Sequence, residues 1–93
     1  MIKLSVMYPK GEGTTFDLDY YMKTHMPMAE RDLGPVRWNV DSGIDGPYMA
    51  VGNLYFESME AFQTGMANNA GTMADIPNFT NAEPVAQISE VVE

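Results

Sequence analysis

The chain has 93 residues, with thirteen acidic and five basic side chains and a formal net charge of −8. This length predicts a single domain, and the 45% hydrophobic share with 19% charged residues is typical of a folded protein. The negative charge disfavours nucleic acid and anionic membranes as partners, and the absence of cysteine excludes disulfides, thiol nucleophiles and iron–sulfur clusters.

A first strand is predicted from Ile2 to Tyr8, where apolar residues alternate with others along the chain. A helix is expected next, with Asp17 as its N-cap and Phe16 as the apolar residue that packs back onto its first turns. The apolar side of this helix carries His25, together with Leu18, Tyr21 and Met22. His25 is the only histidine of the chain, and it is expected to face the interior.

Pro27 interrupts this helical pattern, because proline disfavours helical geometry at the residue before it. We therefore expect the helix to break at Met26 and a short second turn to run over residues 28–33. The Gly34-Pro35 pair that follows is a typical helix stop.

The middle of the chain predicts two strands and a second helix. Apolar residues alternate with polar ones over 36–41, whereas the run YMAVGNLYF at 48–56 is apolar on both faces, as in a central strand. Ser58 is the expected N-cap of a helix that runs through Met66 and as far as Met73. Glycines weaken this helix in its middle and near its end.

A polar loop over 75–81 leads into a last apolar strand over 85–92. The order strand, helix, strand, strand, helix, strand predicts an α+β, ferredoxin-like βαββαβ domain with a four-stranded antiparallel sheet. Two helices cover only one face of such a sheet, so a homodimer is expected to cover the other face. That face is expected to carry Met7, Met49, Val51, Tyr55, Ile88 and Val92.

The residues that give the chain a family resemblance are Phe16-Asp17, Tyr20-Tyr21, His25-Met26-Pro27, Leu33-Gly34-Pro35, the run DIPNFTN at 75–81 and QISEV at 87–91. Together they resemble the EthD family, named for ethyl tert-butyl ether degradation, over nearly the whole chain. The resemblance implies one domain over residues 1–93, paired as a dimeric α/β barrel, and an oxidoreductase or reductase activity. Met28 departs from the leucine usual in the family, and the run NNAG at 68–71 is more polar than expected.

Tyr21 and His25 are one helical turn apart and are expected to line an apolar cleft between helix and sheet. A neutral imidazole accepts a proton at one nitrogen and donates from the other, so His25 is the candidate catalytic acid or base. Tyr21 is the candidate assisting residue, whose hydroxyl can donate to an enolate or phenolate oxygen. The candidate substrate-binding residues are aromatic: Tyr20, Trp38, Tyr55 and Phe79.

Two functions of different classes follow from these residues. The first is a small cofactor-independent enzyme of oxidoreductase type, which acts on an apolar or aromatic carbonyl or phenolic compound with His25 as acid or base. The second is a non-catalytic accessory protein that binds such a compound for a degradative pathway. A structural role for the lone histidine, and packing roles for Trp38 and the nine methionines, stay open beside both.

No cofactor or metal is expected. A single histidine without any cysteine disfavours a mononuclear zinc or iron centre, whereas haem stays open as an alternative because one axial histidine suffices. The first residues lack the pattern of a signal peptide, and no run approaches the roughly 20 apolar residues that span a bilayer. A cytoplasmic location without membrane contact is therefore expected.

Overall fold

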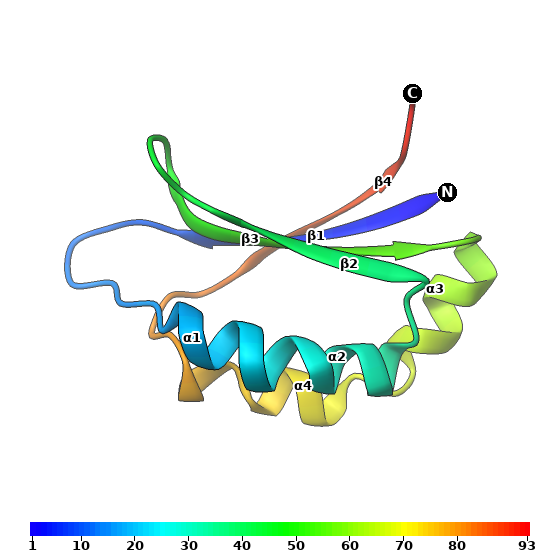
Figure 1. Ribbon diagram of the computed structural model, residues 1–93, viewed down its shortest axis with the longest axis horizontal. Coiled ribbons are helices and arrows are strands. Elements are labelled where there is room, and N and C mark those ends of the chain that lie inside the picture. Colours follow the sequence, from blue (N-terminus) through cyan, green and yellow to red (C-terminus); the bar gives the residue numbers. More distant parts are fainter.

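The computed structural model describes residues 1–93 and shows a single antiparallel sheet with all helices on one of its faces (Figure 1). The strand order β2-β3-β1-β4 and the α+β class confirm the predicted ferredoxin-like arrangement. The strands are β1 (Ile2–Pro9), β2 (Arg37–Ser42), β3 (Tyr48–Phe56) and β4 (Val85–Glu90). The helical elements are α1 (Leu18–Tyr20), η1 (Tyr21–His25), α2 (Met26–Leu33), α3 (Met59–Met66), α4 (Ala70–Ala74) and η2 (Ile76–Asn78).

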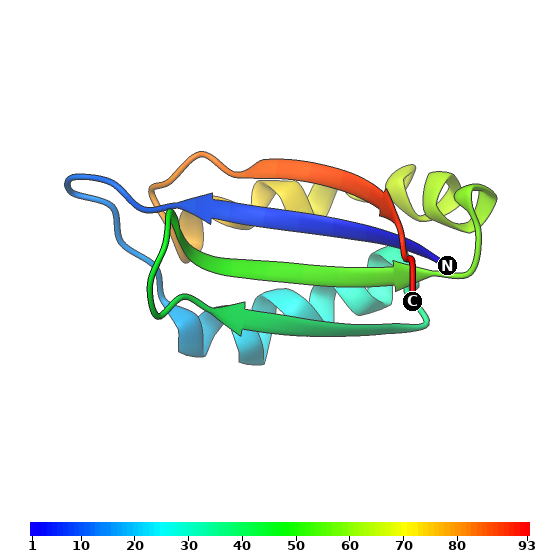
Figure 2. The ribbon, with the colours of Figure 1, turned by 90° about the horizontal axis from the view of Figure 1, so that it is seen from above.

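The core lies between the sheet and the helices. Strand β1 runs through the middle of the sheet, where Leu4 pairs with Leu54 and Tyr8 with Ala50 (Figure 2). These residues face the helices, and burial of each large apolar side chain stabilises the fold by about 1.5–3 kcal/mol. The buried cluster consists of Leu4, Tyr8, Tyr21, Met26, Ala29, Leu33, Ala50, Leu54, Phe56, Phe62 and Phe79.

The open face of the sheet is more polar than the sequence predicted. Ile88 pairs with Leu4 and so lies on the helix side, whereas Val92 lies beyond the end of β4. Met49 packs against the core, next to a register shift between β1 and β3. The predicted apolar set was therefore wrong for these three residues. The open face keeps Met7, Val51 and Tyr55 among polar neighbours such as Ser5, Asn39, Asp41 and Asn53.

The first helix does not break at Met26, so that prediction was wrong. It continues from Leu18 to Leu33 through the π-helical turn η1, in which the Met26 N–H donates to the Tyr21 carbonyl. Pro27 has no N–H to donate, and it is tolerated because it lies in the first turn of α2, just after the wider η1 turn. Single π-helical turns of this kind are frequent at functional sites.

The ends of the helices follow the predicted signals. The Asp17 side chain accepts a hydrogen bond from the Tyr20 N–H over 3.0 Å, and Phe16 packs on Tyr21 at the position expected of a hydrophobic staple. Gly34 ends α2 in the left-handed conformation, with φ 67°. Ser58 caps α3 by accepting from Ala61 N–H.

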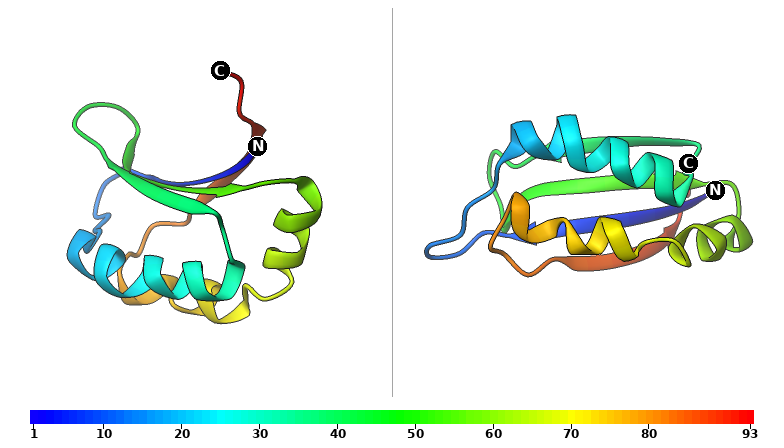
Figure 3. Two further views of the ribbon diagram at one scale, coloured as in Figure 1. Left: turned by 45° about the vertical axis from the view of Figure 1, so that its right-hand side comes forward. Right: turned by 90° about the horizontal axis from the view of Figure 1, so that it is seen from below.

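The predicted second helix occurs as two helices, α3 and α4, separated by a turn over 67–69 (Figure 3). Gly65 allows α3 to pack closely on α2, since a Cβ at this position would lie 2.3 Å from the Leu33 carbonyl oxygen. No helix of the structure is both long and apolar enough to cross a membrane.

Candidate functional site

A largely apolar cavity of about 200 Å³ lies between the helices and the sheet. Twelve of its sixteen lining residues are hydrophobic, and they come from β1, β3, β4 and the helical segments. Its wall includes the only histidine of the chain. The lining residues with polar atoms in their side chains are Tyr8, Tyr21, His25, Asn69 and Thr72.

The imidazole of His25 forms a buried pair with the carboxylate of Asp75. Nδ1 of His25 lies 2.9 Å from Oδ2 of Asp75, and the two residues are only 4% and 6% exposed. An ionised carboxylate can only accept, so Nδ1 carries the proton and Nε2 holds the lone pair. Nε2 has no hydrogen-bond partner in the protein, and no fully buried side-chain nitrogen lacks one, so Nε2 is accessible from the cavity that His25 lines.

Asp75 is held by three donors from three helical segments. Its Oδ1 accepts from the Tyr20 hydroxyl over 2.7 Å and from Nδ2 of Asn78 over 2.9 Å, while Oδ2 is bonded to His25. Burial by itself raises the pKa of Asp75, but these hydrogen bonds together outweigh it and hold the pKa below its ordinary value of 3.8. Asp75 is therefore an ionised carboxylate at neutral pH.

The pKa of His25 is lowered from its ordinary value of 6.5. Burial is the main cause, because it disfavours the charged imidazolium, and the neighbouring carboxylate of Asp75 only partly offsets it. His25 is therefore neutral at pH 7, with Nε2 free to accept a proton. Its ring stacks on Tyr21 at a centroid distance of 5.2 Å and lies 4.5 Å from the ring of Phe79.

The segment that carries Asp75 and Phe79 is fastened to the segment before α1. The Asp17 N–H donates to the Phe79 carbonyl over 2.8 Å, and the Thr80 hydroxyl donates to the Thr15 carbonyl over 2.6 Å. A single β-bridge between residues 16 and 80 joins the same two segments. These bonds fix the position of Asp75 relative to the helix that carries His25.

The structure brings some of the predicted site residues together and separates others. His25 and Tyr21 line the cavity. Phe79 does not line it, but its ring contacts the ring of His25. Tyr20 reaches the site only through its hydrogen bond to Asp75. Trp38 does not line the cavity and donates through Nε1 to Glu30. Tyr55 lies on the opposite face of the sheet, where the Arg37 guanidinium covers its ring.

Two residues of the site were not predicted as site residues. Asp75 was expected in a polar loop that either covers a pocket or only positions the last strand, and Tyr8 was expected only as a strand residue. Asp75 lies 50 positions from His25, so no local spacing in the sequence connects the two. The only signal available was that Asp75 begins the DIPNFTN run, which contributes to the family resemblance.

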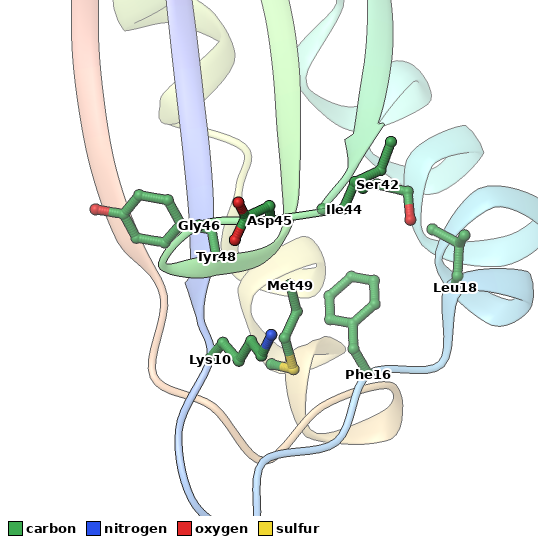
Figure 4. A pocket seen from close by; sticks show the side chains of 10 residues that line it. Lys10, Phe16, Leu18, Ser42, Ile44, Asp45, Gly46, Tyr48 and Met49 are labelled. Carbon is green, nitrogen blue, oxygen red and sulfur yellow. The ribbon is translucent and has the colours of Figure 1, made fainter.

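A second hollow lies at the end of the sheet, beside the loop between β2 and β3 (Figure 4). It has a volume of about 320 Å³, larger than the cavity at His25, and it is more open to solvent than that cavity. Its charged lining residues are Lys10 and Asp45, and neither takes part in any of the three ion pairs of the chain. The cavity at His25 is the better candidate site, because it joins apolar walls to a buried histidine–carboxylate pair.

The site contains no ready-made metal centre. No group of three or more histidine, cysteine, aspartate or glutamate side chains lies together in a way that could hold a metal ion. The single histidine uses Nδ1 for Asp75, and one accessible nitrogen remains.

Solved structures of other proteins share this fold. An EthD-like protein from Ralstonia eutropha JMP134 is 39% identical, with a TM-score of 0.91, over 99% of this chain and 92% of that chain. An ethyl tert-butyl ether degradation (EthD) family protein from Bacillus halodurans C-125 is 20% identical, with a TM-score of 0.78 over 99% of both chains. HapK from Hahella chejuensis, at 16% identity, TM-score 0.60 and coverage of 98% and 94%, shares the fold alone.

No protein-family model and no curated protein matches the chain. The identity to the Ralstonia protein, and the share of both chains over which it extends, are nevertheless high enough to show a common family. The close superposition extends over the elements that carry His25 and Asp75, since nearly the whole chain is covered. On this likeness, the chain belongs to the EthD family.

Proposed function

We propose that the protein is a small cofactor-independent enzyme that removes a proton from an apolar aromatic compound bearing a carbonyl or phenolic group. The proposal rests on one observation: a neutral, buried His25 is held by Asp75 at Nδ1, and its Nε2 is accessible from an apolar cavity. In this arrangement Nε2 accepts the proton as general base. Asp75 keeps the imidazole in the reactive tautomer and stabilises the imidazolium that forms, as carboxylate partners of catalytic histidines do.

The size of the cavity favours a small ligand. An engineered apolar cavity of about 150 Å³ binds benzene, so a cavity of about 200 Å³ has room for one substituted ring. Pockets for drug-sized ligands measure about 300–1,000 Å³, and the volume of the cavity at His25 lies below that range. A haem is larger still, and this comparison supports a function without it.

An oxidoreductase reaction would add a second step. Loss of a proton leaves an electron-rich phenolate or enolate, which can pass electrons to an acceptor such as dioxygen. We propose this step for the protein because its family is named for the degradation of an ether, and degradative pathways commonly oxidise their substrates. In that step a carbon of the phenolate or enolate forms a bond to dioxygen and the proton on His25 passes to the outer oxygen, so the product is a hydroperoxide: the substrate is oxidised by two electrons and dioxygen is reduced to the level of a peroxide.

The His25→Ala variant separates an enzyme from a binding protein. If His25 is the base, turnover should fall by about 10²–10⁴-fold, whereas the affinity for an apolar ligand without a polar group should be nearly unchanged. An equal loss of turnover and affinity would instead favour an accessory protein that only binds the compound. The ligand is identified first by screening small phenols and aryl ketones for a rise in melting temperature.

We also propose that the protein is a homodimer that pairs through the open face of its sheet. All helices lie on the opposite face, and no element of the chain covers Met7, Val51 and the neighbouring polar residues (Figure 1). The side chains of Ser5, Asn53 and Asp41 are linked by hydrogen bonds on this face, so their polar groups are satisfied before pairing. A second copy can therefore cover the face without leaving these groups unpaired.

A further inference from the structure

The carboxylate of Asp75 bridges two residues of the first helix that are five positions apart. Its Oδ1 accepts from the Tyr20 hydroxyl over 2.7 Å, and its Oδ2 lies 2.9 Å from Nδ1 of His25. In a regular α-helix two residues with this spacing point about 140° away from each other, because successive residues turn by about 100°. Such a pair is not expected to share one carboxylate.

The π-helical turn η1 begins directly after Tyr20 and ends at His25, and it brings these two residues to the same side. Its hydrogen bond from the Met26 N–H to the Tyr21 carbonyl spans five positions, instead of the four of an α-helix. The turn therefore holds more residues, and a side chain returns nearer to the one five positions before it. The wider turn is thus what lets Tyr20 and His25 reach Asp75 together.

Tyr20 is the donor that fixes Asp75 relative to His25. The other donor to Oδ1, Asn78, follows Asp75 by three positions in the same segment and moves with it. Tyr20, by contrast, belongs to the helix that carries His25. Its ring stacks on Phe79 at a centroid distance of 6.3 Å, and Phe79 in turn lies against the His25 ring. The Tyr20 hydroxyl therefore ties the carboxylate to the helix on which His25 lies.

The same hydrogen bond draws negative charge away from the rest of the carboxylate. A hydrogen bond to an ionised oxygen is charge-assisted and stabilises the anion. The bond to Asp75 raises the pKa of Tyr20 above its ordinary value of 10.0, so the hydroxyl keeps the proton that it donates. Less negative charge is then left at Oδ2 to stabilise the imidazolium form of His25.

We propose that Tyr20 is a positioning residue: through the wider turn η1 its hydroxyl holds Asp75, which orients His25 and sets the affinity of His25 for a proton. This inference rests on the proposed function of His25 and deepens it. Tyr20 does not line the cavity, so it acts on the reaction through Asp75 and not by contact with the substrate.

The test is NMR of the ligand-free protein, in which the ring nitrogens of the single histidine are observed without overlap. At neutral pH the wild type should carry a proton on Nδ1 and none on Nε2. In Tyr20→Phe the proton affinity of His25 should rise about 3- to 10-fold, because the charge on Asp75 is no longer shared with a phenol. Tyr55→Phe, on the other face of the sheet, is the matched control and should titrate as the wild type does.

A binding measurement shows whether the cavity is intact. Nitrobenzene, an aromatic probe without a proton to lose, should bind the wild type. It should bind Tyr20→Phe equally well, because Tyr20 does not line the cavity. A change in the titration of His25 without a change in nitrobenzene binding is not expected of a residue that only stabilises the fold.

The outcomes separate the two proposals. If the wild type does not bind nitrobenzene, or carries the neutral-pH proton of His25 on Nε2, the proposed function of His25 fails and the role of Tyr20 fails with it. If the wild type behaves as expected and Tyr20→Phe binds nitrobenzene with the proton affinity of His25 unchanged or lower, His25 stands and the role of Tyr20 is overturned.

A second variant covers the case in which Tyr20→Phe fails to fold, which loss of nitrobenzene binding would reveal. Replacement of Tyr20 by 3-fluorotyrosine keeps the hydroxyl and makes it a stronger donor. The proton affinity of His25 should then fall below the wild-type value, and an unchanged or higher value would overturn the proposal.

Discussion

Oδ2 of Asp75 lies 2.9 Å from Nδ1 of His25, and the two residues are 50 positions apart in the chain. The pair is buried, and the remaining carboxylate oxygen is occupied by Tyr20 and Asn78. The imidazole is thus held in one tautomer and one orientation, with its second nitrogen accessible from the cavity. This arrangement is the one that the proposed role of His25 as a general base requires.

Replacement of Asp75 tests its role as the partner of His25. Asp75→Asn keeps the size of the side chain but removes the charge that stabilises the imidazolium, so turnover should fall by about 100-fold or more. Nitrobenzene binding should change little, because Asp75 does not line the cavity. Asp19→Asn is the matched control, since Asp19 pairs with Lys23 on the exposed side of the helix that carries His25, away from the cavity. Equal turnover in the two variants would contradict the assignment.

Acid should destabilise the protein through His25. The pKa of the folded His25 lies below its ordinary value of 6.5, so the unfolded chain binds more protons and stability rises with pH. The contribution of neutral His25 to the free energy of unfolding is fully present above about pH 6.5, the pKa of an unfolded histidine. It is lost as the pH falls through the lower pKa of the folded state. Asp75, with its pKa below 3.8, should add a further loss under more acidic conditions.

Urea unfolding at about pH 7 and about pH 5 measures this effect. In the wild type, the free energy of unfolding should be lower at the more acidic pH. His25→Gln should flatten the decrease, since no other histidine is present to titrate in this range. A decrease of equal size in both proteins would mean that His25 is not the responsible group.

Gly52 should tolerate no larger residue. The Cβ of Gly52→Ala would collide with the Tyr21 hydroxyl, so the ring must move and disturb the cavity. Overpacking of this kind costs about 1–3 kcal/mol of stability. Gly71→Ala is the control: its Cβ would meet only Asp32 at 3.8 Å, and alanine in a helix is about 0.5–1 kcal/mol more stable than glycine. Thermal denaturation should therefore shift in opposite directions for the two variants.

The open face of the sheet should mediate pairing of two chains. Light scattering at micromolar concentration should give about twice the mass of the 10.3 kDa chain. Val51→Lys places a charge in the middle of this face and should yield monomers, because burial of an unpaired charge is costly. Val36→Lys, at an exposed position outside the sheet, should leave the mass unchanged. A monomeric wild type would refute the pairing.

Local signals in the sequence predicted most of the fold. The N-caps at Asp17 and Ser58, the stop at Gly34 and the strand over 48–56 all occur as expected. Each of these signals depends on neighbours within a few positions. The wrong predictions concern features that local signals of this kind do not determine. The helix continues across Pro27 because its π-helical turn contains a hydrogen bond between residues five positions apart, from Met26 to Tyr21, and so accommodates a residue without an N–H. Alternation along a strand does not reveal the register shift beside Met49.

The candidate site could be predicted only in part. Tyr21 and His25 were identified because they share one helix face and because the chain has a single histidine. Asp75 depends on the packing of a distant segment against the first helix. Tyr55 was expected both on the open face of the sheet and among the substrate-binding residues, and it lies on the open face, away from the cavity. A tyrosine of such a strand lines the cavity only if its side chain lies on the helix side of the sheet. The alternation of residue types in this strand does not determine that side.

Deuterium exchange tests the central claim, proton removal by His25, most directly. A small aryl ketone such as 1-indanone is incubated with the protein in deuterated buffer, and loss of the α-proton signal is followed by NMR. The account predicts exchange that is catalysed by the wild type and falls by about 10²–10⁴-fold in His25→Ala, while the variant still binds the ketone. Catalysed exchange that persists in His25→Ala, or a bound ketone that does not exchange in the wild type, would contradict it.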